Sequence, residues 1–207
     1  RGSRNHHAAN LICRLTGAQA AVIVNNCSAA VTLVLAALAR DRAVAVSRGE
    51  LVEIGGGFRV PDVMEESGAR LVEVGTTNRT RLDDYRTAHQ VHQAALMMKV
   101  HPSNYRIRGF TEETSVKALA TLGVPVVADL GSGLIDDACS WLQEGRPSWL
   151  GEEPAVKQTL ESGADLVTFS CDKLFGGPQA GVIAGRSDLV EACANHPLMR
   201  AFRPGAL

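Results

Sequence analysis

The chain of 207 residues carries a formal net charge of −1, with 45% hydrophobic and 21% charged residues. This composition is ordinary for a globular domain, and the near-zero charge excludes a global attraction for nucleic acid, so any RNA contact must be local. Five scattered cysteines without a C-x-x-C pair argue against a zinc site or a disulfide framework, so we expect no metal and a reducing, cytoplasmic setting.

No apolar run approaches the ~18 residues of a transmembrane helix, and the N-terminus has no signal-peptide pattern, so we expect no membrane association. The chain starts at Arg1 without a methionine and stops abruptly at Leu207, which indicates a fragment. Because it contains no linker, we expect residues 1–207 to form one domain.

Short β-type runs and helical patterns alternate along the chain. The β-type runs are 20–24, 43–46, 70–74, 95–100, 124–128, 165–169 and 180–184. The clearest helical patterns between them are 29–40, 62–67, 82–90, 112–121 and 154–162. Continuous apolar strands that alternate with helices predict an α/β fold with three αβα layers and a mostly parallel seven-stranded sheet. Only a few residues separate the last two runs, so the seventh strand is expected to be antiparallel to the sixth.

The longest irregular stretch, 131–151, contains both tryptophans. A loop of that length in a compact domain is usually functional or disordered.

The first strand is followed by small polar residues that open an alanine-rich helix. In open α/β sheets, ligands bind beyond the carboxyl ends of the strands. Asn26, Cys27 and Ser28 at the start of this helix would offer backbone N–H groups and the positive end of the helix dipole to a phosphate group. Ordinary N-capping by Asn26 or Ser28 is the alternative, and both readings can hold together.

The fifth strand ends in Asp129. A carboxylate at this position can bond the protonated ring nitrogen of pyridoxal 5'-phosphate. It could equally cap a turn, or bind magnesium in a nucleotidase, although no P-loop motif supports that last reading.

The sixth strand ends in Ser170, and Asp172, Lys173 and a Gly-Gly-Pro turn follow. A lysine at the end of a buried strand can form a Schiff base with an aldehyde cofactor, because burial favours the neutral, reactive amine. A surface lysine that opens a hairpin is the alternative. The chain thus carries a possible phosphate-binding helix start, Asp129 and Lys173, in this order, at the ends of strands one, five and six. This order is the layout of the large domain of fold type I pyridoxal-phosphate enzymes.

Longer segments resemble the bacterial selenocysteine synthase family, L-seryl-tRNA(Sec) selenium transferase. They are RGSR (1–4), VSRGELVEIGGGFRVPDVMEESGARLVEVGTTNRT (46–80), KVHPSNYRIRGFT (99–111), DLGSG (129–133), DKLFGGPQAG (172–181) and HPLMRAFR (196–203). Family members are considerably longer, so the chain resembles their cofactor domain without the N-terminal region that engages tRNA and the C-terminal small domain. Cys171 stands where the family usually has glycine, and it would strain the backbone if that position needs a positive φ.

The resemblance implies conversion of seryl-tRNA(Sec) to selenocysteinyl-tRNA(Sec) through a dehydroalanyl intermediate held on pyridoxal phosphate, with selenophosphate as the selenium donor. Lys173 would hold the cofactor and move the α-proton. The resemblance also implies a homo-oligomer built from dimers, in the cytoplasm, with no DNA partner.

Positions that match the family's motifs receive roles from the resemblance. Asp129 would pair with the ring nitrogen, and Asp172 would tune the charge of Lys173. The residues expected at the phosphate end are Asn26, Cys27, Ser28 and Ser170. The residues expected to bind the anionic selenium donor are Arg4, Arg200 and Arg203. Arg200 and Arg203 are expected to share one helical face. The alternative is that these arginines are only solvated surface charges. The expected active-site wall consists of Thr76, Thr77, Asn104 and Tyr105, whereas His101 is expected to be structural.

Two other functions remain open at this point. The first is a related lyase or aminotransferase that acts on a small amino acid or amino sugar without tRNA. The GTTNRT and SNYRIRGFT loops argue against it, because they match on the substrate side. The second is an inactive truncated domain.

Overall fold

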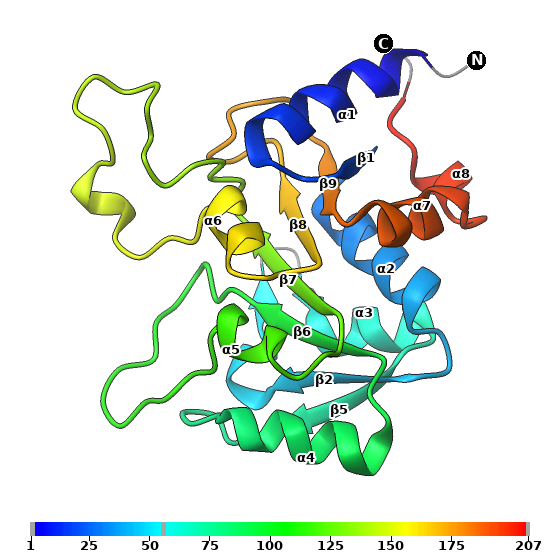
Figure 1. Ribbon diagram of the computed structural model, residues 1–207, viewed down its shortest axis with the longest axis vertical. Helices are drawn as coiled ribbons and strands as arrows, with labels where there is room; N and C mark the ends of the chain where they lie inside the picture. Colours follow the sequence, from blue (N-terminus) through cyan, green and yellow to red (C-terminus); the bar gives the residue numbers. More distant parts are fainter. Residues whose placement is uncertain (1–2, 55–56, 206–207) are drawn as a thin grey trace.

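The computed structural model describes residues 3–54 and 57–205 and contains a seven-stranded sheet (Figure 1). Its strands are β1 (Ala20–Val24), β2 (Ala43–Ser47), β5 (Arg70–Val74), β6 (Leu96–Val100), β7 (Val126–Gly131), β8 (Leu166–Ser170) and β9 (Gly181–Gly185). They lie in the order β1-β9-β8-β7-β6-β2-β5. Strand β9 is antiparallel to both of its neighbours, and the other adjacent pairs are parallel. The predicted sheet and its antiparallel last strand are confirmed.

Helices cover both faces of the sheet, which confirms the three layers. One face carries α2 (Cys27–Leu38), α3 (Val60–Ser67) and α7 (Ser187–Asn195). The other face carries α1 (Ser3–Thr16), α4 (Leu82–His92), α5 (Val116–Ala120) and α6 (Val156–Glu161). Within β6, Leu96 and Met98 belong to the first core and Met97 to the opposite one, as the alternation of side chains along a strand requires.

The parallel strands bring the ends of β7 and β8 together. Asp129 is the register partner of Thr168, and the register shifts between Asp129 and Gly131, where Gly131 adopts a φ of 71°. Beyond this irregularity Gly131 still pairs with Phe169, and Gly131 lies close to Lys173 Nζ. The geometry places the polar groups of both strands at one edge of the sheet.

Some elements were not predicted. They are α1, the hairpin of β3 (Glu53–Ile54) and β4 (Phe58–Arg59), and the 3-10 turns η1 (Arg48–Glu50) and η3 (Ser148–Leu150). A helix after the last strand and a helical segment around Arg200 were expected without bounds, and they are α7 and the short helix α8 (Met199–Phe202). Helix α5 is shorter than expected because Ser115 caps it by accepting a hydrogen bond from Ala118 N, while the preceding Glu112 pairs with Arg79 instead. Within the described ranges, none of the helices is long and apolar enough to cross a membrane.

Candidate functional site

A side-chain cluster lies where α2, β7 and β8 meet. Cys27 Sγ lies 3.4 Å from Asp129 Oδ1, and Thr168 Oγ1 lies 2.8 Å from the same oxygen. Lys173 Nζ lies 3.9 Å from the position that a Cβ atom would occupy on Gly131. The structure therefore brings together three of the predicted strand-end residues, Cys27, Asp129 and Lys173, and adds Thr168, which the sequence analysis did not select.

Burial dominates the electrostatics of this cluster. Asp129 is 5% exposed, and burial raises its pKa, although hydrogen bonds from Thr168 and Cys27 and the charge of Lys173 oppose the rise. Burial and the adjacent Asp129 charge raise the pKa of the Cys27 thiol well above its usual value. Cys27 is therefore protonated near neutral pH and donates its S–H to the carboxylate.

The start of α2 is capped as expected. The Asn26 side chain accepts a hydrogen bond from Ala29 N at 2.8 Å, so the capping reading is correct. A Cβ atom on Gly181 would come within 2.1 Å of Asn26 O, so only glycine allows β9 to approach the helix start this closely. Ser28 is half-buried beside the cap, and Ser170 is buried at the end of β8.

The hairpin between β8 and β9 presents Lys173. Cys171 N donates to Ala180 O at 2.9 Å, and Leu174 N donates to Ser132 O at 2.9 Å. Lys173 and Asp172 are both exposed, so the expectation of a buried amine is wrong: the strand is buried, but the hairpin carries the lysine out of it.

Cys171 fits its position without backbone strain. It is not among the residues with positive φ, so the concern about a glycine-only conformation does not apply. Its side chain is buried in the apolar core with Ile12 and Phe175, and burial raises its pKa to about 11.

His101 joins the same edge of the sheet to the long loop. Its backbone N donates to Asp129 O at 2.9 Å, and its Nε2 lies 3.1 Å from Glu153 Oε2. Burial opposes the ionisation of Glu153, but the interaction with His101 contributes to a pKa below the ordinary value. His101 thus has the satisfied contacts expected of a structural histidine.

The four residues predicted as an active-site wall are exposed, and the side chains of three of them, Thr76, Asn104 and Tyr105, donate hydrogen bonds to backbone carbonyls. Tyr105 Oη donates to Gly49 O at 2.8 Å, and Asn104 Nδ2 donates to Glu53 O at 3.0 Å. Thr76 Oγ1 donates to Arg79 O at 3.0 Å, and Thr77 O would lie 2.5 Å from a Cβ atom on Gly49. Among the described residues, none of the four has a hydrogen bond to Asp129 or Lys173.

The predicted arginine cluster is only partly described. Arg4 belongs to α1, but its side chain lies outside the described residues. Arg200 lies in α8 and Arg203 is its C-cap with extended backbone, and both are exposed. Arg203 N still donates to Met199 O at 3.0 Å and its φ of −61° is helical, so only its ψ of 142° departs from the helix, as the following Pro204 requires. That the two arginines share a helical face stays a prediction. The segment lies beside the turn that precedes α2, since Phe202 O accepts a hydrogen bond from Asn25 N at 2.8 Å.

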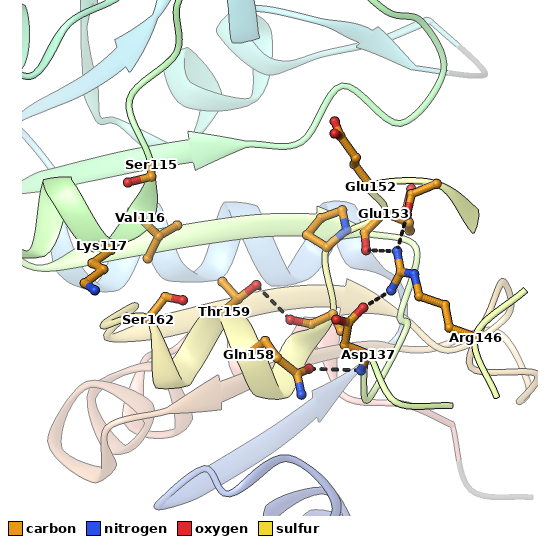
Figure 2. A pocket seen from close by; sticks show the side chains of 13 residues that line it. Ser115, Val116, Lys117, Asp137, Arg146, Glu152, Glu153, Gln158, Thr159 and Ser162 are labelled. Atoms are coloured by element: carbon orange, nitrogen blue, oxygen red, sulfur yellow. Dashed lines mark hydrogen bonds and ion pairs between the residues drawn. The ribbon is translucent and has the colours of Figure 1, made fainter. Parts of the chain in front are cut away.

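Two hollows lie away from the Asp129 cluster. A hollow of about 390 Å³, lined by both polar and apolar side chains, lies between α5, α6 and the long loop (Figure 2). Arg146 closes one side of it by donating to Gly151 O and Glu153 O, and it pairs with Asp137. A second, apolar hollow of about 480 Å³ separates α1 from the lysine hairpin. In the part of the chain that the structure describes, no group of three or more His, Cys, Asp or Glu side chains could hold a metal ion.

Two solved structures show to which fold class this chain belongs. D-Glucosaminate-6-phosphate ammonia-lyase superposes with a TM-score of 0.77 at 22% identity, over 97% of this chain and 53% of that protein. The pyridoxal-5'-phosphate dependent protein YhfS from Escherichia coli superposes with a TM-score of 0.64 at 20% identity, over 91% of this chain and 46% of that protein. The fold is therefore that of the fold type I large domain, as predicted.

Sequence comparison gives the family. The family model SelA, L-seryl-tRNA selenium transferase, matches residues 1–207, so the chain belongs to this family. L-Seryl-tRNA(Sec) selenium transferase of Serratia proteamaculans is 54% identical over 211 residues, covering 100% of this chain and 44% of the relative. The enzyme of the same name from Mannheimia succiniciproducens is 51% identical over 207 residues, covering 98% of this chain and 43% of the relative. The resemblance is confirmed, and the chain spans less than half the length of these relatives.

Proposed function

We propose that the protein that contains this chain converts L-seryl-tRNA(Sec) to L-selenocysteinyl-tRNA(Sec) with selenophosphate, and that this chain is its pyridoxal-phosphate-binding domain. The observation that carries the proposal is the cluster of Cys27, Asp129 and Lys173 at the strand ends of a chain that belongs to this family. The tRNA-engaging region and the small domain would lie in the rest of the protein.

The residues of the cluster fit pyridoxal phosphate. A buried carboxylate suits a protonated ring nitrogen, the start of the 12-residue helix α2 suits a phosphate group, and the Lys173 amine suits an aldehyde. When bound, the cofactor withdraws electrons from the α-carbon of an attached amino acid. The group is therefore compatible with what the structure offers.

Each residue of the cluster then has a distinct task. Asp129 would hold the ring nitrogen, and the backbone N–H groups of Cys27 and Ser28 would bind the phosphate with Asn26 and Ser170 beside them. Lys173 Nζ would hold the cofactor covalently and, once released, take the α-proton of the seryl group. The exposed Asp172 next to Lys173 would favour the charged form of the amine.

The selenium donor and the seryl group would approach over the surrounding loops. Arg200 and Arg203 would bind the phosphate of the donor together with Arg4, and the attachment of their segment to the Asn25 turn supports this placement. Thr76, Thr77, Asn104 and Tyr105 would form the substrate-side wall. We further propose a cytoplasmic homo-oligomer built from dimers.

The test is conversion of seryl-tRNA(Sec) by the full-length protein. With selenophosphate and pyridoxal phosphate present, we expect selenocysteinyl-tRNA(Sec) to form, and no product without selenophosphate. The likeness to an ammonia-lyase favours one alternative, a lyase or aminotransferase that acts on a small amino acid or amino sugar. Turnover of free serine or of an amino-sugar phosphate, with none of seryl-tRNA(Sec), would establish that alternative. Absence of both activities despite bound cofactor would contradict both.

A further inference from the structure

One oxygen of the buried Asp129 carboxylate is held from two sides. Thr168 Oγ1 and Cys27 Sγ both donate to Oδ1, at 2.8 Å and 3.4 Å. Among the hydrogen bonds of the described residues, none uses Oδ2. The carboxylate therefore has one occupied oxygen and one oxygen that remains for a ligand.

Both donors are fixed by the fold rather than by flexible side chains. Thr168 is fully buried within β8 and is the register partner of Asp129 on β7. Its neighbours Val167 and Phe169 are apolar and fully buried, so a hydroxyl in this strand needs a dedicated acceptor. Cys27 is the first residue of α2, and the Asn26 cap holds the start of that helix.

We propose that Cys27 and Thr168 are positioning residues that keep Asp129 charged and turn its Oδ2 toward the ring nitrogen of the cofactor, an inference that rests on the proposed function. Cys27 would thus have two roles: its backbone N–H would bind the cofactor phosphate, and its thiol would position Asp129. The thiol and the hydroxyl act on the cofactor only through Asp129.

The physical reason is the cost of burying a charge. Burial favours the neutral carboxylic acid, and hydrogen bonds donated to the carboxylate offset this preference. Hydrogen bonds to a charged acceptor contribute more than neutral ones, and two donors on one oxygen also fix the rotation of the carboxylate. Loss of either donor should leave Asp129 more often neutral and free to rotate.

The test compares two cofactors in the full-length protein. The first is pyridoxal phosphate, and the second is its analogue with a C–H group in place of the ring nitrogen. We expect Cys27→Ala and Thr168→Val each to weaken binding of pyridoxal phosphate about tenfold, because each removes one hydrogen bond to a charged group. Binding of the analogue should stay unchanged, because it lacks the atom that Asp129 contacts. Cys27→Ser and Thr168→Ser keep a donor and should restore most of the affinity.

Matched controls separate positioning from packing. Thr159→Val removes a buried hydroxyl that bonds Ala155 O, and Cys13→Ala removes a thiol of α1. Neither should change the affinity for either cofactor. As a second readout, the pH below which pyridoxal phosphate affinity falls should move upward in Thr168→Val, because the pKa of Asp129 rises further without that donor.

The outcomes are distinguishable. Equal losses for both cofactors would show that Cys27 and Thr168 only fill space, and unchanged pyridoxal phosphate binding would show that they do nothing for the site; either result overturns the inference. If the unmodified protein binds pyridoxal phosphate more tightly than the analogue, the proposed cofactor site stands whatever the variants do. If it binds neither compound, the proposed function fails and the inference fails with it.

Discussion

Lys99 Nζ lies 2.7 Å from Glu50 Oε1, and the two side chains are only 15% and 8% exposed. The other Glu50 oxygen accepts a hydrogen bond from Val100 N at 2.8 Å. This buried ion pair attaches η1 to strand β6. It thereby holds the segment that Asn104 and Tyr105 also contact.

Replacing Lys99 should destabilise the fold, because the buried Glu50 carboxylate would lose its ion-pair partner. We expect Lys99→Met to lower the free energy of unfolding by about 3–5 kcal/mol, because Glu50 would remain buried without its partner. Urea unfolding measures this change. Glu113 also pairs with Lys99 but is 81% exposed, so Glu113→Gln is the control and should change stability by less than about 0.5 kcal/mol. A Lys99→Met protein as stable as the unmodified one would contradict this account of the pair.

The charge of Asp129 should cost stability when no cofactor is bound. Burial raises the pKa of Asp129, so the folded chain binds this proton more readily than the unfolded chain. The contribution to stability is then greatest below the ordinary aspartate pKa and is lost as pH rises through the raised folded value. We expect cofactor-free Asp129→Asn to be more stable than the unmodified protein at neutral pH and to bind pyridoxal phosphate less tightly.

Urea unfolding of Asp129→Asn and of the unmodified protein, from neutral to acidic pH, measures the sign of the stability difference between them. The difference between them should shrink as the pH is lowered, because Asp129 then becomes neutral in both states. Asp188→Asn at the exposed start of α7 is the control for loss of an aspartate elsewhere. If Asp129→Asn made the protein less stable at neutral pH, the carboxylate would instead be stabilising the fold.

Two glycines near the lysine hairpin should respond differently to alanine. A Cβ atom on Gly181 would collide with Asn26 O, whereas Gly176 has open space but a φ of 73°. We expect Gly176→Ala to cost about 1 kcal/mol through its backbone conformation alone. Gly181→Ala should cost about 2 kcal/mol or more, because backbone must move, and should also weaken pyridoxal phosphate binding at the displaced start of α2. Thermal unfolding and cofactor titration of the two variants measure both effects, and equal behaviour would contradict the collision.

The sheet was predictable because its strands are continuous apolar runs buried on both faces, which separate clearly from the helices. Helix α1 was not predicted because the polar residues His6, His7 and Asn10 obscure the helical periodicity of its apolar residues. Strands β3 and β4 have two residues each and are too short to show an alternation of apolar and polar residues.

The candidate site was predictable only as a set of strand ends. Asp129 and Lys173 could be selected because ligands of open α/β sheets bind beyond the carboxyl ends of the strands, where both residues were expected to lie. The bond from Thr168 to Asp129 could not, since it depends on the register of two strands; a polar residue in an apolar run was its only signal. The exposure of Lys173 depends on how the hairpin after β8 projects, which no local pattern encodes.

The proposed function depends most directly on Lys173 as the residue that holds the cofactor. The most direct measurement is borohydride reduction of the full-length protein loaded with pyridoxal phosphate, followed by digestion and mass mapping of the modified lysine. We predict that the cofactor is found on the peptide that contains Lys173, and that Lys173→Ala abolishes the labelling. Label on Lys99, Lys117 or Lys157 in the unmodified protein, with Lys173 free, would contradict the account.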